Sequence, residues 1–175
     1  MRKHLIMVMD DISKIKPHKD TSFAFLLEAQ ARGYQLFYLN LEGLWLNGDQ
    51  ATAWVRRIQV FDDANHWFEL STPQAHRFDE NDCVMMRKDP PVDAQYLHAT
   101  LILDRAKAQG ASVINDPQAL RDFNEKLAIS HFGECMPPTV VTCVHSEHKA
   151  FIETHQKIVI KPLDGMGGRG IFLIE

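Results

Sequence analysis

The sequence predicts an α/β protein with a parallel, doubly wound sheet. Short apolar runs alternate with helical segments as far as about residue 132, an order typical of a parallel sheet with helices on both faces. The first apolar run, "HLIMVMD" at 4–10, has the continuous hydrophobicity of a central strand buried on both faces. A fold of this class binds ligands where its strands end, which directs attention to the loops that follow the strands.

The expected elements follow one another along the chain. Strands are predicted near 5–9, 34–39, 83–87 and 111–114, and helices near 21–32, 93–109 and 117–132. Cap and stop residues support the three helices: Asp20, Thr21 or Ser22 and then Gly33, Asp93 and then Gly110, and Pro117 in the first turn of the third.

Two stretches depart from this alternation. Segment 44–60 carries Asn47-Gly48, a strong hairpin signal, and predicts an antiparallel excursion from the sheet edge, whereas 71–82 is expected to be a loop. Beyond Pro137-Pro138 we expect a strand, a short helix and two final strands, in 137–143, 146–156, 157–163 and 171–175. We divide the chain into a domain over 1–124 and the beginning of a second domain over 125–175.

Composition excludes several classes of function. The chain has 19 basic and 23 acidic side chains, and this net charge of −4 gives no electrostatic reason to expect nucleic acid or an anionic membrane as a partner. No apolar run is long enough to span a bilayer or to form the core of a secretory signal. The three cysteines are odd in number and widely spaced, which indicates reduced thiols in the cytoplasm.

The stretch "IVIKPLDGMGGRGIFLIE" at 158–175 has the pattern of a phosphate-binding hairpin. Four glycines between two apolar runs let backbone N–H groups approach an anion closely: Gly165, Gly167, Gly168 and Gly170. Lys161 stands just before this loop, where its ammonium can meet a phosphate. Neither a Walker-type GxxxxGK[ST] motif nor a dinucleotide fingerprint is present, and a tight hairpin without a ligand is the alternative.

Other candidates are weaker when taken singly. Arg87 follows a predicted strand and can hold a carboxylate in a bidentate fork, or it can belong to an ordinary loop in which Asp89 neutralises Lys88. Asp10 and Ser13 lie in the loop after the first strand and can contact a substrate or simply face solvent.

Lys126 and a histidine-rich stretch complete the candidates. Lys126, expected in mid-helix, can be a surface lysine paired with acidic neighbours. Cys143, His145 and His148 lie close together in sequence, but no second cluster with ligand spacing accompanies them, so no metal site is expected in this chain.

Four stretches together resemble the bacterial glutathione synthetases of the ATP-grasp ligase superfamily. They are "MVMDDISKIKPHKDTSFAFLLEAQARGY", "MMRKDPPVDAQYLHAT", "INDPQALRDFNEKL" and "IKPLDGMGGRGIF". The resemblance implies a Rossmann-like pre-ATP-grasp domain followed by the start of an ATP-grasp domain. It also implies a homotetrameric, cytoplasmic ligase of glutathione biosynthesis, which joins γ-glutamylcysteine to glycine through an acyl phosphate and uses ATP and Mg²⁺.

The resemblance also assigns roles to residues. Lys126 and Lys161 match the two nucleotide lysines of the family, and the four glycines match its flexible phosphate loop. Ligands for Mg²⁺ are expected in a C-terminal part, so we expect the chain to be an N-terminal portion that is inactive alone. The alternatives are another ATP-grasp ligase, similar to D-alanine–D-alanine ligase, and a non-catalytic assembly or binding module with this fold.

Overall fold

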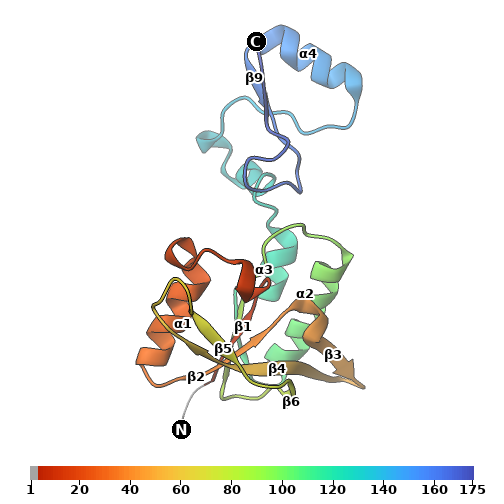
Figure 1. The fold of residues 1–175 in the computed structure, drawn as a ribbon. Coiled ribbons are helices and arrows are strands. Elements are labelled where there is room, and N and C mark those ends of the chain that lie inside the picture. Colours follow the sequence, from red (N-terminus) through yellow and green to blue (C-terminus); the bar gives the residue numbers. More distant parts are fainter. Residues whose placement is uncertain (1–3) are drawn as a thin grey trace. The chain divides into compact units, whose positions relative to one another are not determined.

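A computed structural model of the protein describes residues 4–175. Two compact units make up the chain, one extending to Arg121 and the other from Asp122 to Glu175 (Figure 1). We describe each unit by itself.

Four parallel strands form the centre of the N-terminal unit, in the order β2-β1-β7-β8. Their bounds are His4–Val8 for β1, Gln35–Leu39 for β2, Asp82–Met86 for β7 and Ser112–Ile114 for β8. Helix α1 (Thr21–Ala31) connects β1 to β2, and α2 (Ala94–Ala108) connects β7 to β8. The predicted βαβ alternation is therefore confirmed for this part of the chain.

The sheet separates two apolar clusters because successive side chains of a strand point to opposite faces. Ile6 and Val8 of β1 pack in the cluster that includes Leu103 of α2, whereas Leu5 and Met7 pack in the cluster that includes Phe23 and Leu26 of α1. The two helices lie on opposite sides of the strands (Figure 1). Both faces are thus covered, which explains why the β1 sequence is apolar without alternation.

The helix ends confirm the capping predictions. The Asp20 carboxylate accepts a hydrogen bond from the N–H of Phe23 over 2.9 Å, and Asp93 caps α2 through the N–H of Tyr96 over the same distance. Gly33 and Gly110, which follow the two helices, have φ of 78° and 108°, a left-handed conformation that other residues adopt only with strain.

The sheet is mixed, so the prediction of a parallel sheet was only partly right. Strands β3 (Leu44–Asn47) and β4 (Gln50–Val60) form the expected hairpin, with Gly48 at a φ of 62° in the turn. Strand β4 then joins the sheet antiparallel to β2. Strand β3 follows β2 after the short η3 turn (Leu41–Gly43), and both strands pair antiparallel with β4. The tight turn after β3 therefore reverses the chain and sets β4 antiparallel to β2.

Two further short strands pair with β4, and sequence reasoning missed both. They are β5 (Phe68–Leu70) and β6 (Gln74–Arg77), and β6 lies within the segment expected to be a loop. Three of the four β6 residues are exposed and only His76 is partly buried, so the segment has no apolar pattern from which a strand could be predicted.

Two glutamine side chains complete the hydrogen bonding of β4 near its ends. The Gln30 amide donates to the carbonyl oxygen of Val60 over 2.7 Å and accepts from the N–H of Val60 over 2.9 Å. The Gln109 amide does the same at Ala51, accepting from its N–H over 2.5 Å and donating to its carbonyl oxygen over 3.2 Å. Each amide thus imitates the backbone of a neighbouring strand.

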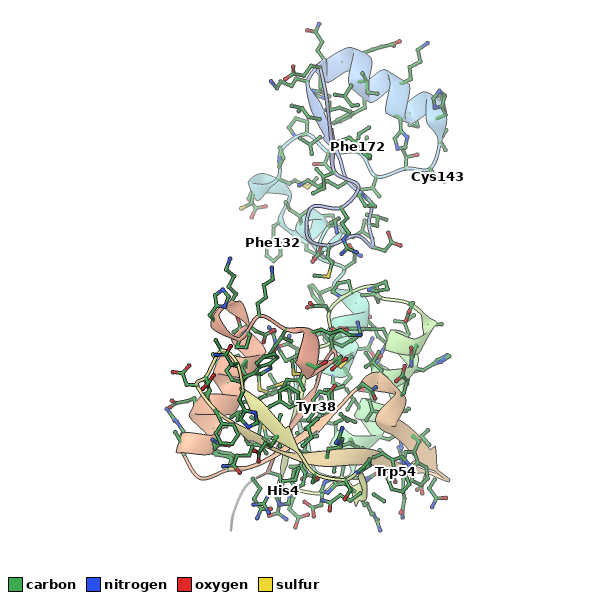
Figure 2. All side chains as sticks on the ribbon, in the orientation of Figure 1. His4, Tyr38, Trp54, Phe132, Cys143 and Phe172 are labelled. Carbon is green, nitrogen blue, oxygen red and sulfur yellow. The ribbon has the colours of Figure 1, made fainter. Side chains whose placement is uncertain are left out.

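Side-chain exposure varies along the same strands. Tyr38 of β2 is 8% exposed, whereas Trp54 of β4 is 51% exposed (Figure 2).

The loop after β1 contains two short 3-10 turns, η1 (Ile12–Lys14) and η2 (Pro17–Lys19). Among the described residues, no helix is long and apolar enough to cross a membrane.

The third helix ends ten residues earlier than predicted. Helix α3 covers Pro117–Asp122, and the 3-10 segment η4 begins only at Ala128 and extends to Cys135. The carboxamide oxygen of Asn124 accepts from the N–H groups of Lys126 and Leu127 over 2.9 and 3.2 Å, which replaces helical hydrogen bonds with a turn. Lys126 therefore lies in a turn, and its predicted position in mid-helix was wrong.

The rest of the C-terminal unit contains α4 (His145–His155) and a hairpin of β9 (Ile158–Ile160) and β10 (Phe172–Ile174). The strand expected in 137–143 does not form. Thr139 and Thr142 instead make local hydrogen bonds, to the carbonyl oxygen of Pro137 and from the N–H of Val144, so the segment turns rather than pairs.

We predict that Leu103→Ala will destabilise the N-terminal unit by roughly 2–5 kcal/mol, because Leu103 is fully buried and its loss leaves a cavity. Leu101→Ala on the same helix is the matched control, since Leu101 is 53% exposed and its change is expected to stay within about 0.5 kcal/mol. Urea unfolding followed by tryptophan fluorescence measures both, because all three tryptophans of the chain belong to this unit. Equal effects of the two substitutions would contradict the assigned packing.

Candidate functional site

The first part of the candidate site lies where β1 and β7 end. The backbone N–H of Arg87 donates to the carbonyl oxygen of Val8, the last residue of β1, over 2.7 Å. A cavity of about 220 Å³ opens beside this junction. Its lining comes from the loops after the two strands, from the segment before α1 and from the first turn of α1, and includes Asp10, Lys19, Ser22, Arg87 and Asp89.

Arg87 is held by the first turn of α1. Its Nε donates to the hydroxyl oxygen of Ser22 over 3.1 Å, and Ser22 is only 5% exposed. This contact fixes one edge of the guanidinium plane, while the side chain as a whole remains exposed at the cavity. The arrangement suits bidentate recognition of a carboxylate by the outer nitrogens. Sequence reasoning identified Arg87 and missed Ser22 as its support.

Asp10 links the loops that follow β1 and β7. Its carboxylate lies 3.0 Å from the Lys88 ammonium and also accepts from the N–H of Asp89 over 3.0 Å. Lys88 donates in addition to the carbonyl oxygen of Asp89 over 2.6 Å. Lys88 thus pairs with Asp10, and not with the Asp89 carboxylate that the ordinary-loop alternative assigned to it. The 78 residues between Lys88 and Asp10 gave no sequence signal for this pair.

Ser13 does not join this group. Its hydroxyl and its N–H both donate to one carboxylate oxygen of Asp11, over 2.7 and 3.0 Å. These two hydrogen bonds from Ser13 lower the pKa of Asp11 below its ordinary value. The structure brings Asp10 and Arg87 together at the cavity, whereas Ser13 is used by a local turn and does not line it.

The second part of the candidate site is the glycine loop between β9 and β10 in the C-terminal unit. Phe172 pairs with Ile160 at the base of this loop, so the predicted hairpin is confirmed. Gly167 and Gly168 have φ of 62° and 78°, a backbone that L residues rarely adopt. Glycine adopts this backbone without strain and has no Cβ, which allows an anion to approach the backbone of the loop closely.

Lys126 lies against this glycine loop. Its ammonium donates to the carbonyl oxygens of Gly165 and Leu163 over 2.7 and 3.3 Å, and it forms an ion pair with Glu125 over 2.7 Å. Asn124 donates to the same Leu163 carbonyl oxygen over 3.2 Å. Two candidates that lie about 40 residues apart in sequence are thus brought together in one unit.

Lys161 follows the last residue of β9 and is exposed. Its position at the end of an apolar strand agrees with the prediction. The four glycines, Lys126 and Lys161 all belong to the same unit, whereas Arg87 and Asp10 belong to the other.

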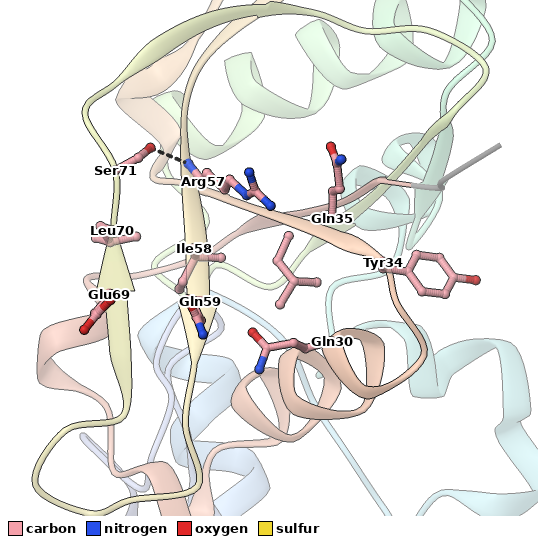
Figure 3. Close-up of a pocket in the computed structure, with 10 residues that line it drawn as sticks. Gln30, Tyr34, Gln35, Arg57, Ile58, Gln59, Glu69, Leu70 and Ser71 are labelled. Carbon is pink, nitrogen blue, oxygen red and sulfur yellow. Dashed lines mark hydrogen bonds between the residues drawn. The ribbon is translucent and has the colours of Figure 1, made fainter.

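A larger hollow of about 690 Å³ lies elsewhere in the N-terminal unit, between α1, β2, β4 and β5 (Figure 3). Gln30, Gln35 and Gln59 line it, together with Arg57, whose N–H donates to the Ser71 hydroxyl over 2.9 Å. It is an open groove where β2 and β4 diverge, and its charged side chains do not converge on a common point (Figure 3). We therefore place the candidate site at the strand ends and not in the larger groove.

Comparison with known proteins identifies the family. Residues 4–121 match the family described as "Prokaryotic glutathione synthetase, N-terminal domain", and residues 125–175 match "Prokaryotic glutathione synthetase, ATP-grasp domain". The chain belongs to the prokaryotic glutathione synthetase family. Among its curated relatives, the glutathione synthetases of Vibrio parahaemolyticus and Shewanella oneidensis are each 47% identical to it over 169 residues, 97% of the chain. The glutathione synthetase of Xanthomonas axonopodis is 48% identical over 172 residues, 98% of the chain.

The chain spans about half the length of the curated relatives that it matches, 54% for each of these three. The similarity covers both units, including the strand-end cavity and the glycine loop. Membership of the glutathione synthetase family thus rests on the part of the chain that carries the candidate residues.

We predict that Gly165→Ala will change the conformation of the loop, because a Cβ there would lie 2.6 Å from Cγ of Pro162. Amide chemical shifts and hydrogen exchange over 162–171 measure the effect. Gly133→Ala is the control, since its Cβ would meet nothing within 4 Å. Unchanged shifts in the Gly165→Ala variant would show that the close approach to Pro162 does not shape the loop.

Proposed function

We propose that the chain supplies residues for the ligand sites of an ATP-dependent glutathione synthetase, which joins γ-glutamylcysteine to glycine. The observation that carries this proposal is the position of the Lys126 ammonium, 2.7 Å from the carbonyl oxygen of Gly165. It puts a cation beside the glycine loop in a chain that belongs to this family.

The proposed reaction explains the need for cations at this loop. A substrate carboxylate oxygen attacks the γ-phosphorus of ATP, ADP leaves, and an acyl phosphate results. The amine of glycine then attacks the acyl carbon and displaces phosphate. The first step brings two anions together, so Lys126, Lys161 and the N–H groups of the loop would stabilise the transferring phosphoryl group. For this, Lys126 would turn from the loop carbonyl oxygens toward the phosphates.

The loop would also protect the acyl phosphate. A closed loop excludes water, which would otherwise hydrolyse this intermediate before glycine reaches it. The glycines allow the loop to change between open and closed states at low conformational strain.

The proposed reaction would use Mg²⁺ together with ATP. Such a site needs converging oxygen ligands, usually carboxylates together with the phosphates. Among the described residues of the C-terminal unit no group of three such side chains converges, since the single set of potential metal ligands lies in the other unit. We therefore assign no Mg²⁺ ligand and derive no step through the metal.

At the strand ends, we propose that Arg87 binds a carboxylate of γ-glutamylcysteine. Ser22 holds the guanidinium at Nε, which leaves the bidentate edge for the substrate. Asp10 would act mainly by fixing the loop, because its carboxylate is already paired with Lys88 and the N–H of Asp89. Ser13 would contact a substrate only if it left Asp11.

A chimera tests the overall proposal. In it, residues 1–175 replace the aligned part of the Vibrio parahaemolyticus relative, and ADP release is measured with ATP, Mg²⁺ and γ-glutamylcysteine. Release that depends on glycine supports the proposal. Release that depends on D-alanine would instead indicate a ligase similar to D-alanine–D-alanine ligase, and a folded, ATP-binding but inactive chimera would favour a non-catalytic module.

The family setting leads to two further proposals, a cytoplasmic location and a homotetramer. Sedimentation of the chimera distinguishes a tetramer from smaller species.

In the chimera, Arg87→Ala is expected to raise the KM for γ-glutamylcysteine about tenfold to a hundredfold, with less effect on the KM for ATP, because it removes a charged hydrogen bond to one substrate. Arg32→Ala is the control, as Arg32 is an exposed residue that pairs with Glu28 on α1. Equal effects on both KM values would count against the assigned role.

Lys161→Ala in the same chimera is expected to lower kcat/KM for ATP about a hundredfold or more, because a phosphate charge loses its partner in the transition state. Lys149→Ala should leave the kinetics unchanged, since Lys149 lies on the surface of α4 within 3.7 Å of Glu153. Wild-type kinetics for Lys161→Ala would show that this lysine is only a surface residue.

A further inference from the structure

Three side chains meet where β1 and β7 begin, at the ends of these strands that lie away from the strand-end cavity. His4 is the first residue of β1, Asp82 is the first residue of β7, and His76 belongs to β6. His4 lies about 13 Å along β1 from the end that leads to Asp10. Figure 2 labels His4 at this end of the unit. The proposed ligase function does not use this cluster.

The two imidazoles converge on one carboxylate. Nδ1 of His4 lies 2.8 Å from Oδ1 of Asp82, and Nε2 of His76 lies 2.8 Å from Oδ2. The potential ligand atoms of the three residues all lie within 4.8 Å of one another. Ligands of a tetrahedral zinc ion are about 3.3 Å apart, given zinc–ligand distances near 2.0–2.1 Å, so shifts of an ångström or so would admit an ion.

The carboxylate is buried between the two imidazoles. The Asp82 side chain has no exposed surface, and its oxygens lie within hydrogen-bond distance of His4, His76 and the N–H of Asp79. A buried carboxylate flanked by two imidazoles offers the oxygen and nitrogen ligands that a divalent transition-metal ion takes in proteins.

The surroundings hold the ligands in place. The N–H of Asp79 donates to Oδ2 of Asp82 over 2.9 Å and fixes the orientation of the carboxylate. The Phe37 ring lies edge-on to His4 and stacks on His76, with centroid separations of 5.3 and 5.7 Å, and Phe78 meets His76 edge-on at 5.8 Å. This apolar wall restricts both rings. The side chains of His4 and His76 keep 24% and 15% of their surface exposed, so water can reach an ion between them.

We propose that His4, His76 and Asp82 form a binding site for a divalent transition-metal ion of the zinc type. Nδ1 of His4, Nε2 of His76 and Oδ1 of Asp82 would be the three protein ligands, and water would complete the coordination. The ion would join β6, which among the described strands pairs with β4 alone, to the central strands β1 and β7. Its role is therefore structural.

The test uses the 175-residue chain without a histidine tag, after metal removal by a chelator. Zn²⁺ binding is measured by calorimetry, and Co²⁺ absorption reports the ligand types. We expect one ion per chain, a Co²⁺ spectrum of nitrogen and oxygen ligation, and a rise of roughly 5–10 °C in the thermal transition of the N-terminal unit, followed by tryptophan fluorescence, at a Zn²⁺ concentration a hundred times Kd.

Matched variants locate the site. His76→Gln and His4→Asn keep an amide N–H near the original nitrogen, so each can still donate to Asp82 while the imidazole ligand is lost. Both are expected to weaken binding at least about a hundredfold with little change in the metal-free thermal transition. His66→Gln is the control, because His66 is an exposed histidine 3.1 Å from Glu69 and lies outside the cluster.

Three results would overturn the proposal. The first is an absence of stoichiometric Zn²⁺ binding, which would show that the cluster is a hydrogen-bond network only. The second is binding that His76→Gln and His4→Asn both leave intact. The third is a Co²⁺ spectrum with thiolate charge-transfer bands, which would point to the exposed Cys135 or Cys143 instead.

Discussion

The burial of β1 on both faces is the constraint on which the rest of the N-terminal unit depends. Ile6 and Met7 are both fully buried, yet they belong to different apolar clusters, one under each helix. The strand is also hydrogen-bonded along both edges, to β2 and to β7. Its two ends are therefore fixed, one leading into Asp10 beside Arg87 and the other carrying His4 beside Asp82. A shift of one residue in register would exchange the two clusters and dismantle both ends at once.

The βαβ framework could be predicted because its signals are local. A continuous apolar run, a capping carboxylate and a glycine after a helix each act within a few residues, as Asp20 and Gly33 do for α1. The errors arose where non-local pairing or side-chain competition decided the structure. The polar strand β6 exists only because β4 offers an edge, and Asn124 ends a helix whose apolar pattern continues past it.

In the candidate site, too, local sequence signals could be predicted and non-local contacts could not. Sequence patterns, together with the family resemblance in the case of Lys126, pointed to Arg87, Asp10, Lys126, Lys161 and the four glycines. The structure brings Arg87 to Asp10 and Lys126 to Gly165. The partners that hold them could not be predicted. Ser22 lies 65 residues from Arg87, and Lys88 lies 78 residues from Asp10, without any spacing rule that connects them. The same is true of His4 and Asp82, whose hydrogen bond spans 78 residues.

The two glutamines that imitate a strand at the ends of β4 have a consequence for the behaviour of the protein in solution. An exposed strand edge is a template on which another chain can add, and such addition leads to domain swapping and fibrils. At Val60 and at Ala51 the backbone groups are already occupied by the side chains of Gln30 and Gln109. Strand β4 therefore has no free backbone groups at these two positions with which another strand could pair, and this protects the protein against intermolecular strand addition there.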